Sequence, residues 1–260
     1  MLHHEISGNG KKPLVLLHGF MENTTIWDEM EAHLSKDFTL IKIDLPGHGK
    51  SKVYQEIHTV ELMAEKVKEV IDALKLEKIN LLGHSLGGYV SLAFAEKFPE
   101  ILESMTLFFS TTVADDDEKK QIRRRSIAVI DENFETFVKT SIPNLFSNNE
   151  KDILEGKIEL AKNIAKSTDK EGVKAAQLGM AERPDRTEIL ENLDAKILII
   201  AGKYDNAVKT ENLLKIIPEK TNIKTYVLDC GHNGHWEKPT ICAEIINTEL
   251  LHNLPKKFVL

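Results

Sequence analysis

The sequence predicts an α/β fold, a mostly parallel central sheet with helices on both faces. Short apolar runs of strand length alternate along the chain with longer segments of helical periodicity, as in strands joined by crossover helices. These apolar runs are continuous rather than alternating, which indicates strands buried on both faces. The stretch 111–192 interrupts the alternation without a strand pattern. We therefore expect one α/β core, formed by 1–110 and 193–260, with a helical insertion.

The composition is that of an ordinary globular protein. The chain has 260 residues, of which 42% are hydrophobic and 29% charged, and this length suits one large domain. A net charge of −7 disfavours nucleic acid and anionic membranes as partners. No apolar run approaches the roughly 18 residues of a membrane span, and the first residues lack the order of a signal peptide. We expect a cytoplasmic protein, and leave a homodimer open.

The first half of the chain supplies most of the predicted sheet. We expect strands at 13–17, 39–45, 78–82 and 104–109, and helices at 24–34, 59–74 and 86–98. Thr59 is expected to cap its helix, with Glu61 favourable in the first turn. The apolar residues of that helix recur at helical spacing, namely Val60, Met63, Val67, Val70, Ile71 and Leu74. This spacing predicts one buried face.

The second half contains the insertion and the end of the sheet. We interpret 111–192 as a helical lid over the sheet edge, because helical patterns lie between acidic and basic runs that suit a solvated surface. Strands are then expected at 196–201 and 223–228, and helices at 210–217 and 239–251. We predict no element for 254–260.

The stretch Gly83-His84-Ser85-Leu86-Gly87 lies at the centre of the functional prediction. An apolar strand precedes this Gly-x-Ser-x-Gly motif and an apolar helix follows it, which is the context of a nucleophile elbow. Glycines two residues to either side relieve crowding around a serine in a strained turn. The start of the following helix offers free N–H groups and a positive dipole end. The sequence thus predicts Ser85 as a nucleophile.

Other polar residues follow predicted strands directly. They are His18 with Gly19 and Phe20, then Ser110, and then Asp205. Ligands of open α/β sheets bind beyond the carboxyl ends of the strands. We therefore expect these residues to gather with Ser85 at one edge of the sheet.

Six motifs in this order resemble those of the α/β-hydrolase fold superfamily, in its serine-nucleophile, lid-bearing, small-molecule esterase-like branch. The motifs are His18-Gly19-Phe20, Asp44-Leu45-Pro46-Gly47-His48-Gly49-Lys50-Ser51, Gly83-His84-Ser85-Leu86-Gly87-Gly88, Arg183-Pro184-Asp185-Arg186, Gly202-Lys203-Tyr204-Asp205, and Gly231-His232 with Glu237-Lys238-Pro239. The resemblance covers essentially the whole chain. It implies an α/β-hydrolase fold and a catalytic triad in the order Ser85, Asp205, His232.

The resemblance also implies the roles of the neighbouring residues. The backbone N–H groups of Phe20 and Leu86 would form the oxyanion hole. We expect the side chains of Phe20, Tyr89, Phe109 and Ser110 in the substrate pocket.

Each triad role has alternatives within the sequence. A carboxylate must orient the histidine, and Asp229 is the rival of Asp205 because it lies just before His232. His235 is the rival base, which we instead expect to pack beside Trp236. His18 and His84 are interpreted as a loop-bracing residue and as an elbow residue turned away from the nucleophile.

We expect no metal and no cofactor. His232 and His235 form a His-x-x-His pair, and His3 and His4 are adjacent, but a zinc site needs further ligands. No Gly-x-Gly-x-x-Gly motif or phosphate loop occurs, so no nucleotide is implied. Cys230 and Cys242 are predicted to be free thiols.

The expected function is hydrolysis of a small-molecule ester, with water as co-substrate and an acyl-enzyme on Ser85. The same triad also serves thioesterases, enol-lactonases, carbon–carbon bond hydrolases, haloperoxidase-like enzymes and a menaquinone-pathway synthase. The synthase typically carries a basic residue where Tyr89 stands here, which disfavours that alternative. A non-catalytic receptor for a small ligand is the alternative from another class, because fold alone does not decide function.

Overall fold

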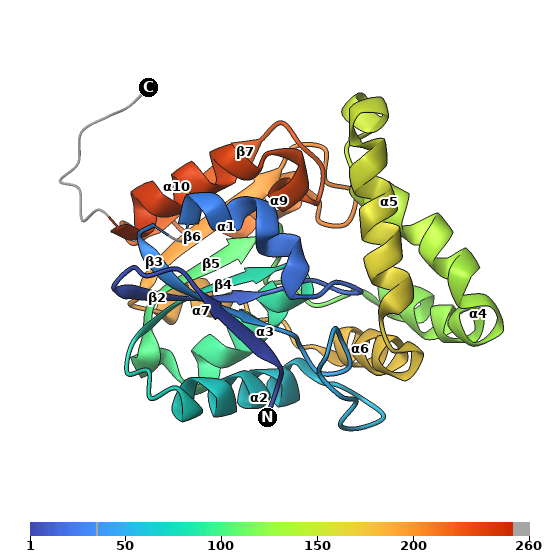
Figure 1. The fold of residues 1–260 in the computed structure, drawn as a ribbon, viewed down its shortest axis with the longest axis horizontal. Coiled ribbons are helices and arrows are strands. Elements are labelled where there is room, and N and C mark those ends of the chain that lie inside the picture. Colours follow the sequence, from blue (N-terminus) through green and yellow to red (C-terminus); the bar gives the residue numbers. More distant parts are fainter. Residues whose placement is uncertain (35, 252–260) are drawn as a thin grey trace.

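A seven-stranded sheet forms the centre of the computed structural model, which describes residues 1–34 and 36–251 (Figure 1). The strands are β1 (His4–Ser7), β2 (Lys12–Leu17), β3 (Phe38–Ile43), β4 (Ile79–His84), β5 (Leu102–Phe108), β6 (Lys196–Gly202) and β7 (Ile223–Leu228). Their order is β1-β3-β2-β4-β5-β6-β7. β1 pairs antiparallel with β3, and the other neighbours are parallel. The predicted α/β fold is confirmed.

Helices cover both faces of this sheet (Figure 1). One face carries α2 (Val60–Ala73), α3 (Leu86–Lys97), α7 (Glu188–Asn192) and α8 (Thr210–Ile216); the other carries the 3₁₀ turn η1 (Thr24–Trp27) with α1 (Asp28–Leu34), α9 (Gly234–Glu237) and α10 (Pro239–Leu251). β2 shows how one strand serves both layers. Val15 and Leu17 join the first core, and Leu14 and Leu16 join the second, because successive side chains of a strand point to opposite faces.

Local sequence explains where several elements begin and end. Thr59 caps α2, and its Oγ1 accepts a hydrogen bond from Leu62 N at 3.1 Å, as the sequence predicts. β3 stops at Ile43, earlier than expected. The next residue is Asp44, whose side chain accepts hydrogen bonds from the backbone N–H groups of Thr24 and Lys50. β1 was not predicted from the sequence. It is a short edge strand of mixed polarity, and it lacks the apolar run of a buried strand.

Residues 111–192, all of which the structure describes, contain no strand. They form α4 (Asp117–Ser141), the 3₁₀ turns η3 (Ile142–Leu145) and η4 (Asn148–Glu150), α5 (Lys151–Ser167), α6 (Lys170–Glu182) and α7. Figure 1 shows α4, α5 and α6 gathered at one end of the molecule, beside the sheet. We call residues 117–182 the α4–α6 segment. α7 differs from them, because its buried Ile189 and Leu190 pack in the core on the α3 face.

Two sequence expectations concern membranes and the end of the chain. Within residues 1–34 and 36–251, no helix combines the length and the apolar character needed to cross a bilayer. The tail 254–260, for which no element was predicted, lies outside the described residues.

Candidate active site

Ser85 occupies a strained turn between β4 and α3. Its φ of 49° and ψ of −109° lie in a region that a residue with a Cβ rarely adopts. The two flanking glycines make the turn possible. A Cβ at Gly83 would lie 2.2 Å from Gly87 O, and one at Gly87 would lie 2.4 Å from Leu17 O. The crowding that the motif predicts is therefore present, and it fixes the backbone that carries Ser85.

Asp205 and His232 meet at the carboxyl ends of β6 and β7. Asp205 Oδ2 lies 2.7 Å from His232 Nδ1, and both side chains are buried. Asp205 Oδ1 accepts hydrogen bonds from Ala207 N and Val208 N at 2.8 Å each, so the carboxylate cannot swing away. An ionised carboxylate beside Nδ1 fixes the tautomer with the proton on that nitrogen. His232 Nε2 is then left to accept a proton.

The rival acid and base of the sequence lie elsewhere. The Asp229 side chain is 73% exposed and pairs with Lys203 Nζ at 3.2 Å. His235 is fully buried in α9, with its ring 4.4 Å from that of Trp236, as expected. Of the four candidates, Asp205 and His232 are the pair that the structure brings together.

The start of α3 packs directly on the loop after β2. A Cβ at Gly87 would also lie 2.8 Å from His18 O, so Leu86 and Phe20 belong to adjoining backbone segments. Leu86 is the first residue of α3, and the first N–H groups of a helix have no partner within it. The positive dipole end at this position favours a developing oxyanion.

His18 braces the base of that loop. Its Nε2 accepts a hydrogen bond from Leu45 N at 2.9 Å, and its Nδ1 lies 2.7 Å from Gly19 O. Burial lowers the pKa of this histidine, which suits the neutral tautomer that these two contacts require. This arrangement matches the loop-bracing interpretation of His18.

A cavity of about 720 Å³ brings Ser85 and His232 onto one surface. Its lining includes Phe20 and Tyr89 from the core, and α4–α6 residues such as Arg123, Phe137, Gln177 and Met180. The other two side chains expected in the pocket lie beneath the surface. Ser110 Oγ donates a hydrogen bond to Ser85 O at 2.8 Å, and Phe109 packs against Phe108 and Gly234. Phe109 and Ser110 support the elbow and do not line the cavity.

Charged groups cluster on the cavity wall where α4 begins and α6 ends. Buried Asp115 faces three cations, Arg123 Nε at 2.5 Å, Arg183 at 2.9 Å and Lys119 Nζ at 3.7 Å. The Arg183 guanidinium lies 4.0 Å from the centre of the Tyr89 ring, a cation–π contact. Burial opposes ionisation of Asp115, but the hydrogen bond and charge of Arg183 and Arg123 outweigh it and lower its pKa.

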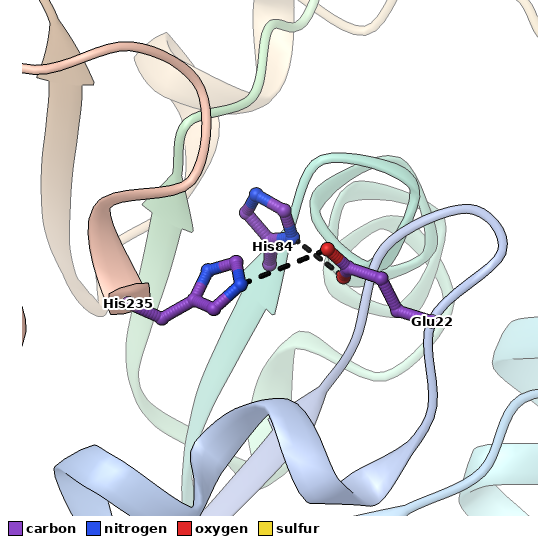
Figure 2. Close-up of side chains that lie close together, drawn as sticks. All are labelled: Glu22, His84 and His235. Atoms are coloured by element: carbon purple, nitrogen blue, oxygen red, sulfur yellow. Dashed lines mark hydrogen bonds and ion pairs between the residues drawn. The ribbon is translucent and has the colours of Figure 1, made fainter. Parts of the chain in front are cut away.

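A second buried cluster, which the sequence did not reveal, lies beside Ser85, and two of its members, Glu22 and His84, border the same cavity. Figure 2 shows Glu22, His84 and His235 pointing toward one another. Glu22 Oε2 lies 2.8 Å from His84 Nδ1, and Glu22 Oε1 lies 3.7 Å from His235 Nε2. Burial opposes the charge of Glu22, but the charge and hydrogen bond of His84 prevail and lower its pKa to about 2. The one available signal was the position of Glu22, two residues after His18-Gly19-Phe20 in the loop that follows a predicted strand.

The same cluster contains the residues best able to hold a metal ion in the described part of the chain. The ligand atoms of Glu22, His84 and His235 lie within 4.8 Å of one another. His232, the other half of the His-x-x-His pair, is not among them. Because the proton between Glu22 and His84 would have to be displaced by such an ion, we propose no metal here.

The sequence model of the α/β hydrolase fold family matches residues 12–239 of this chain. The chain belongs to the α/β-hydrolase fold family. Among solved structures, this α/β hydrolase is similar to a thermophilic esterase from Thermogutta terrifontis, solved with malate bound. The two are 33% identical with a TM-score of 0.89, over 96% of this chain and 93% of the other. An enol-lactonase from Burkholderia xenovorans has the same TM-score at 21% identity, over 96% of each chain, and shows the fold alone.

Curated relatives of this α/β hydrolase carry several functional names. A Mycobacterium tuberculosis uncharacterised protein is 35% identical over 102 residues, but the match spans 39% of this chain and 30% of that protein. A putative 2-succinyl-6-hydroxy-2,4-cyclohexadiene-1-carboxylate synthase of Bacillus subtilis is 28% identical, over 92% of this chain and 90% of its own length. A 2-hydroxy-6-oxononadienedioate/2-hydroxy-6-oxononatrienedioate hydrolase of Escherichia coli is 27% identical, over 91% and 86%.

Proposed function

We propose that this α/β hydrolase cleaves esters of small carboxylic acids through an acyl-enzyme on Ser85. The observation that carries the proposal is the buried 2.7 Å contact between His232 Nδ1 and Asp205, on the same cavity as a serine in a strained elbow. A serine hydroxyl needs a neighbouring base to become a nucleophile. Here that base is held in the required tautomer by a carboxylate.

The chemistry follows from these positions. Ser85 Oγ attacks the ester carbonyl while His232 Nε2 takes its proton, and the N–H groups of Leu86 and Phe20 stabilise the oxyanion. The carbon–oxygen bond to the alcohol then breaks, and His232 gives its proton to the departing oxygen. Water attacks the acyl-enzyme in the same way and releases the carboxylic acid. The positive end of α3 acts throughout on the negative charge.

The α4–α6 segment acts as a lid in this proposal. α4 and α6 supply residues of the cavity that contains Ser85, among them Arg123 and Gln177. A closed wall over the serine excludes water from the ester until it is bound, and strengthens the electrostatic contacts inside. Differences in this segment would then set which acyl group fits.

A second candidate is a hydrolase for substrates that carry a carboxylate on the acyl part. The favouring observation is the group of three cations, Lys119, Arg123 and Arg183, that surrounds Asp115 on a cavity wall to which Asp116 and Glu118 also belong. The names of the Escherichia coli and Bacillus subtilis relatives describe dioate and carboxylate compounds. An aryl ester with a terminal carboxylate should then be preferred to its neutral analogue, and Arg123→Gln should reduce that preference.

The test combines turnover with labelling. Purified protein should hydrolyse short-chain aryl esters with an initial burst, and a fluorophosphonate probe should label Ser85. Ser85→Ala keeps the same Cβ in the elbow, so we expect a folded protein whose kcat is lower by about 10⁴-fold or more. A folded wild type that neither turns over esters, thioesters, lactones and diketones nor reacts with the probe would favour the ligand-receptor alternative.

A further inference from the structure

A buried chain of polar contacts joins Glu22, His84 and the backbone of His232. His84 Nδ1 lies 2.8 Å from Glu22 Oε2, and His84 Nε2 lies 3.0 Å from the carbonyl oxygen of His232. The side chains of Glu22 and His84 are 9% and 1% exposed, so their contacts are largely shielded from water, although both residues border the cavity of Ser85. The triad chemistry makes no use of this chain of contacts.

The contacts determine the protonation of His84. A carbonyl oxygen can only accept a hydrogen bond, and so can an ionised carboxylate. Glu22 Oε2 also accepts a hydrogen bond from Gly19 N at 2.6 Å, which favours its ionised form. Both ring nitrogens of His84 therefore face acceptors and both carry a proton. His84 is an imidazolium, paired with the Glu22 carboxylate.

We propose that His84, charged by Glu22, is a positioning residue that sets the approach of His232 to Ser85. His84 precedes Ser85 in the chain, and it donates a hydrogen bond to the backbone carbonyl of His232. The imidazolium of His84 thereby links the backbone segment that carries Ser85 to the backbone segment that carries His232. This inference rests on the proposed roles of Ser85 and His232.

The reason such a tie matters is geometric. A serine and its base must lie within hydrogen-bonding reach for proton transfer, and a misplacement of about 1 Å can cost about 10²-fold in rate. Asp205 orients the ring of His232 from one side. His84 acts instead on the main chain of His232, which the ring contact leaves unconstrained. His232 N also donates to Leu145 O at 2.8 Å.

Loss of one proton from His84 would turn the attraction between its Nε2 and the carbonyl oxygen of His232 into a repulsion. The hydrogen bond to the charged carboxylate is the stronger one, so neutral His84 keeps its proton on Nδ1. The lone pair of Nε2 then faces the carbonyl of His232 and repels it. Burial by itself lowers the pKa of His84, but the charge and hydrogen bond of Glu22 prevail and raise it above its ordinary 6.5.

The groups around His84 define how it titrates. Glu22 faces it from the loop after β2, and His232 and Asp205 act on it from the loops after β7 and β6. His235 faces it from α9 with rings 4.7 Å apart, and His18 lies at the end of β2. Burial lowers the pKa of His235 far below its ordinary value, so this ring stays neutral while His84 titrates.

The test is the pH profile of fluorophosphonate labelling at Ser85, measured on folded full-length protein. We expect the wild type to show an alkaline limb from His84. His84→Phe should label about 10²-fold more slowly and lack the alkaline limb, with kcat for an ester falling far more than KM rises. Glu22→Gln should move the alkaline limb to lower pH and recover rate on the acid side, where His84 is charged again.

His235→Phe is the matched control. It replaces another buried ring of the same cluster, whose nitrogens form no hydrogen bond with the described residues, and it should keep both the rate and the profile. The proposal is overturned if folded His84→Phe labels within about threefold of the wild type, or if Glu22→Gln leaves the alkaline limb in place.

Nitrogen NMR gives an independent measurement. Should His84→Phe not fold, ¹⁵N signals of the wild-type imidazole still decide the matter. Two protonated nitrogens at neutral pH support the proposal, and one unprotonated nitrogen contradicts it. A wild type that is not labelled at Ser85 at all would instead contradict the proposed function, so the two failures are distinguishable.

Discussion

At the scale of single residues, the two buried histidines of the last loop separate catalysis from packing. His232 joins Asp205 at 2.7 Å and lines the cavity, whereas His235 packs against Trp236 and Trp27. His232→Ala should therefore lower kcat by about 10⁴-fold, as loss of a triad member does. His235→Ala should keep most of kcat and lower the melting temperature, because it leaves a cavity. A dead His235→Ala beside an active His232→Ala would mean that the base has been misassigned.

The sequence could predict those residues that short motifs mark. Ser85, Asp205 and His232 each stand in a short motif; the context of a strand, a turn and a helix predicted Ser85, and the resemblance pointed to all three. Glu22 could not be found in this way, since it contacts His84 across 62 positions of the chain and no spacing rule links the two. Asp115 and Arg183 are a similar case, because their contact depends on how α6 lies against the segment before α4.

At the scale of elements, prediction succeeded where one physical signal dominated. The buried parallel strands are continuous apolar runs, and β7 has the bounds that the sequence predicts. The edge strand β1 has no such run and was missed. From the sequence, a helix was expected only from residue 239, so α9 was also missed. It forms a separate short helix that ends at Glu237. The buried carboxylate of Glu237 accepts hydrogen bonds from backbone N–H groups.

Glu237 holds the loop of His232 in place. Its carboxylate accepts hydrogen bonds from Gly231 N at 2.8 Å, Asn233 N at 3.1 Å and Ser147 N at 3.1 Å. Glu237→Ala leaves three buried donors without an acceptor, and each costs about 1–3 kcal/mol. We expect a large loss of unfolding free energy in denaturant titrations, together with a lower kcat.

Glu237→Gln is the graded control for that experiment, because it keeps one acceptor oxygen. Its stability and kcat should fall between those of the wild type and Glu237→Ala. Equal stability of all three proteins would show that the loop is held by other contacts.

The α4–α6 segment should move more than the sheet that carries the triad. α4 is a 25-residue helix in which only Ile130 and Val138 are buried, and its helical backbone breaks at Asn133. Few buried apolar contacts mean a low free energy of local opening. Amides of α4 should therefore exchange hydrogen faster than those of Leu81 in β4 or Ile199 in β6. Equal protection in α4 and in these strands would argue against a mobile lid.

At the scale of the whole molecule, the buried charges tie stability to pH. The folded pKa of Glu22, about 2, lies below its ordinary 4.5 because the charge and hydrogen bond of His84 outweigh burial. Its contribution is present above pH 4.5 and is lost as pH falls toward 2, by about 3 kcal/mol at roughly 1.4 kcal/mol per pKa unit. The contribution of His84 to stability depends on pH in the opposite direction. Its pKa is raised above 6.5 by Glu22 against the effect of burial, so its contribution is lost as pH rises through that folded value.

The two signs together predict a window in which this ion pair stabilises the fold most, between pH 4.5 and 6.5. Unfolding free energies of the wild type and of the double variant Glu22→Gln/His84→Gln, measured by denaturant titration across pH, should differ most in this window and converge on both sides. The shape of the difference is the diagnostic, because replacing a buried ion pair also removes its desolvation cost and shifts the whole curve. Asp229→Asn, which alters an exposed carboxylate paired with Lys203, is the control and should change stability little at any pH, because exposed ion pairs contribute little to stability. A flat difference for the double variant as well would mean that Glu22 and His84 are not charged together in the folded protein.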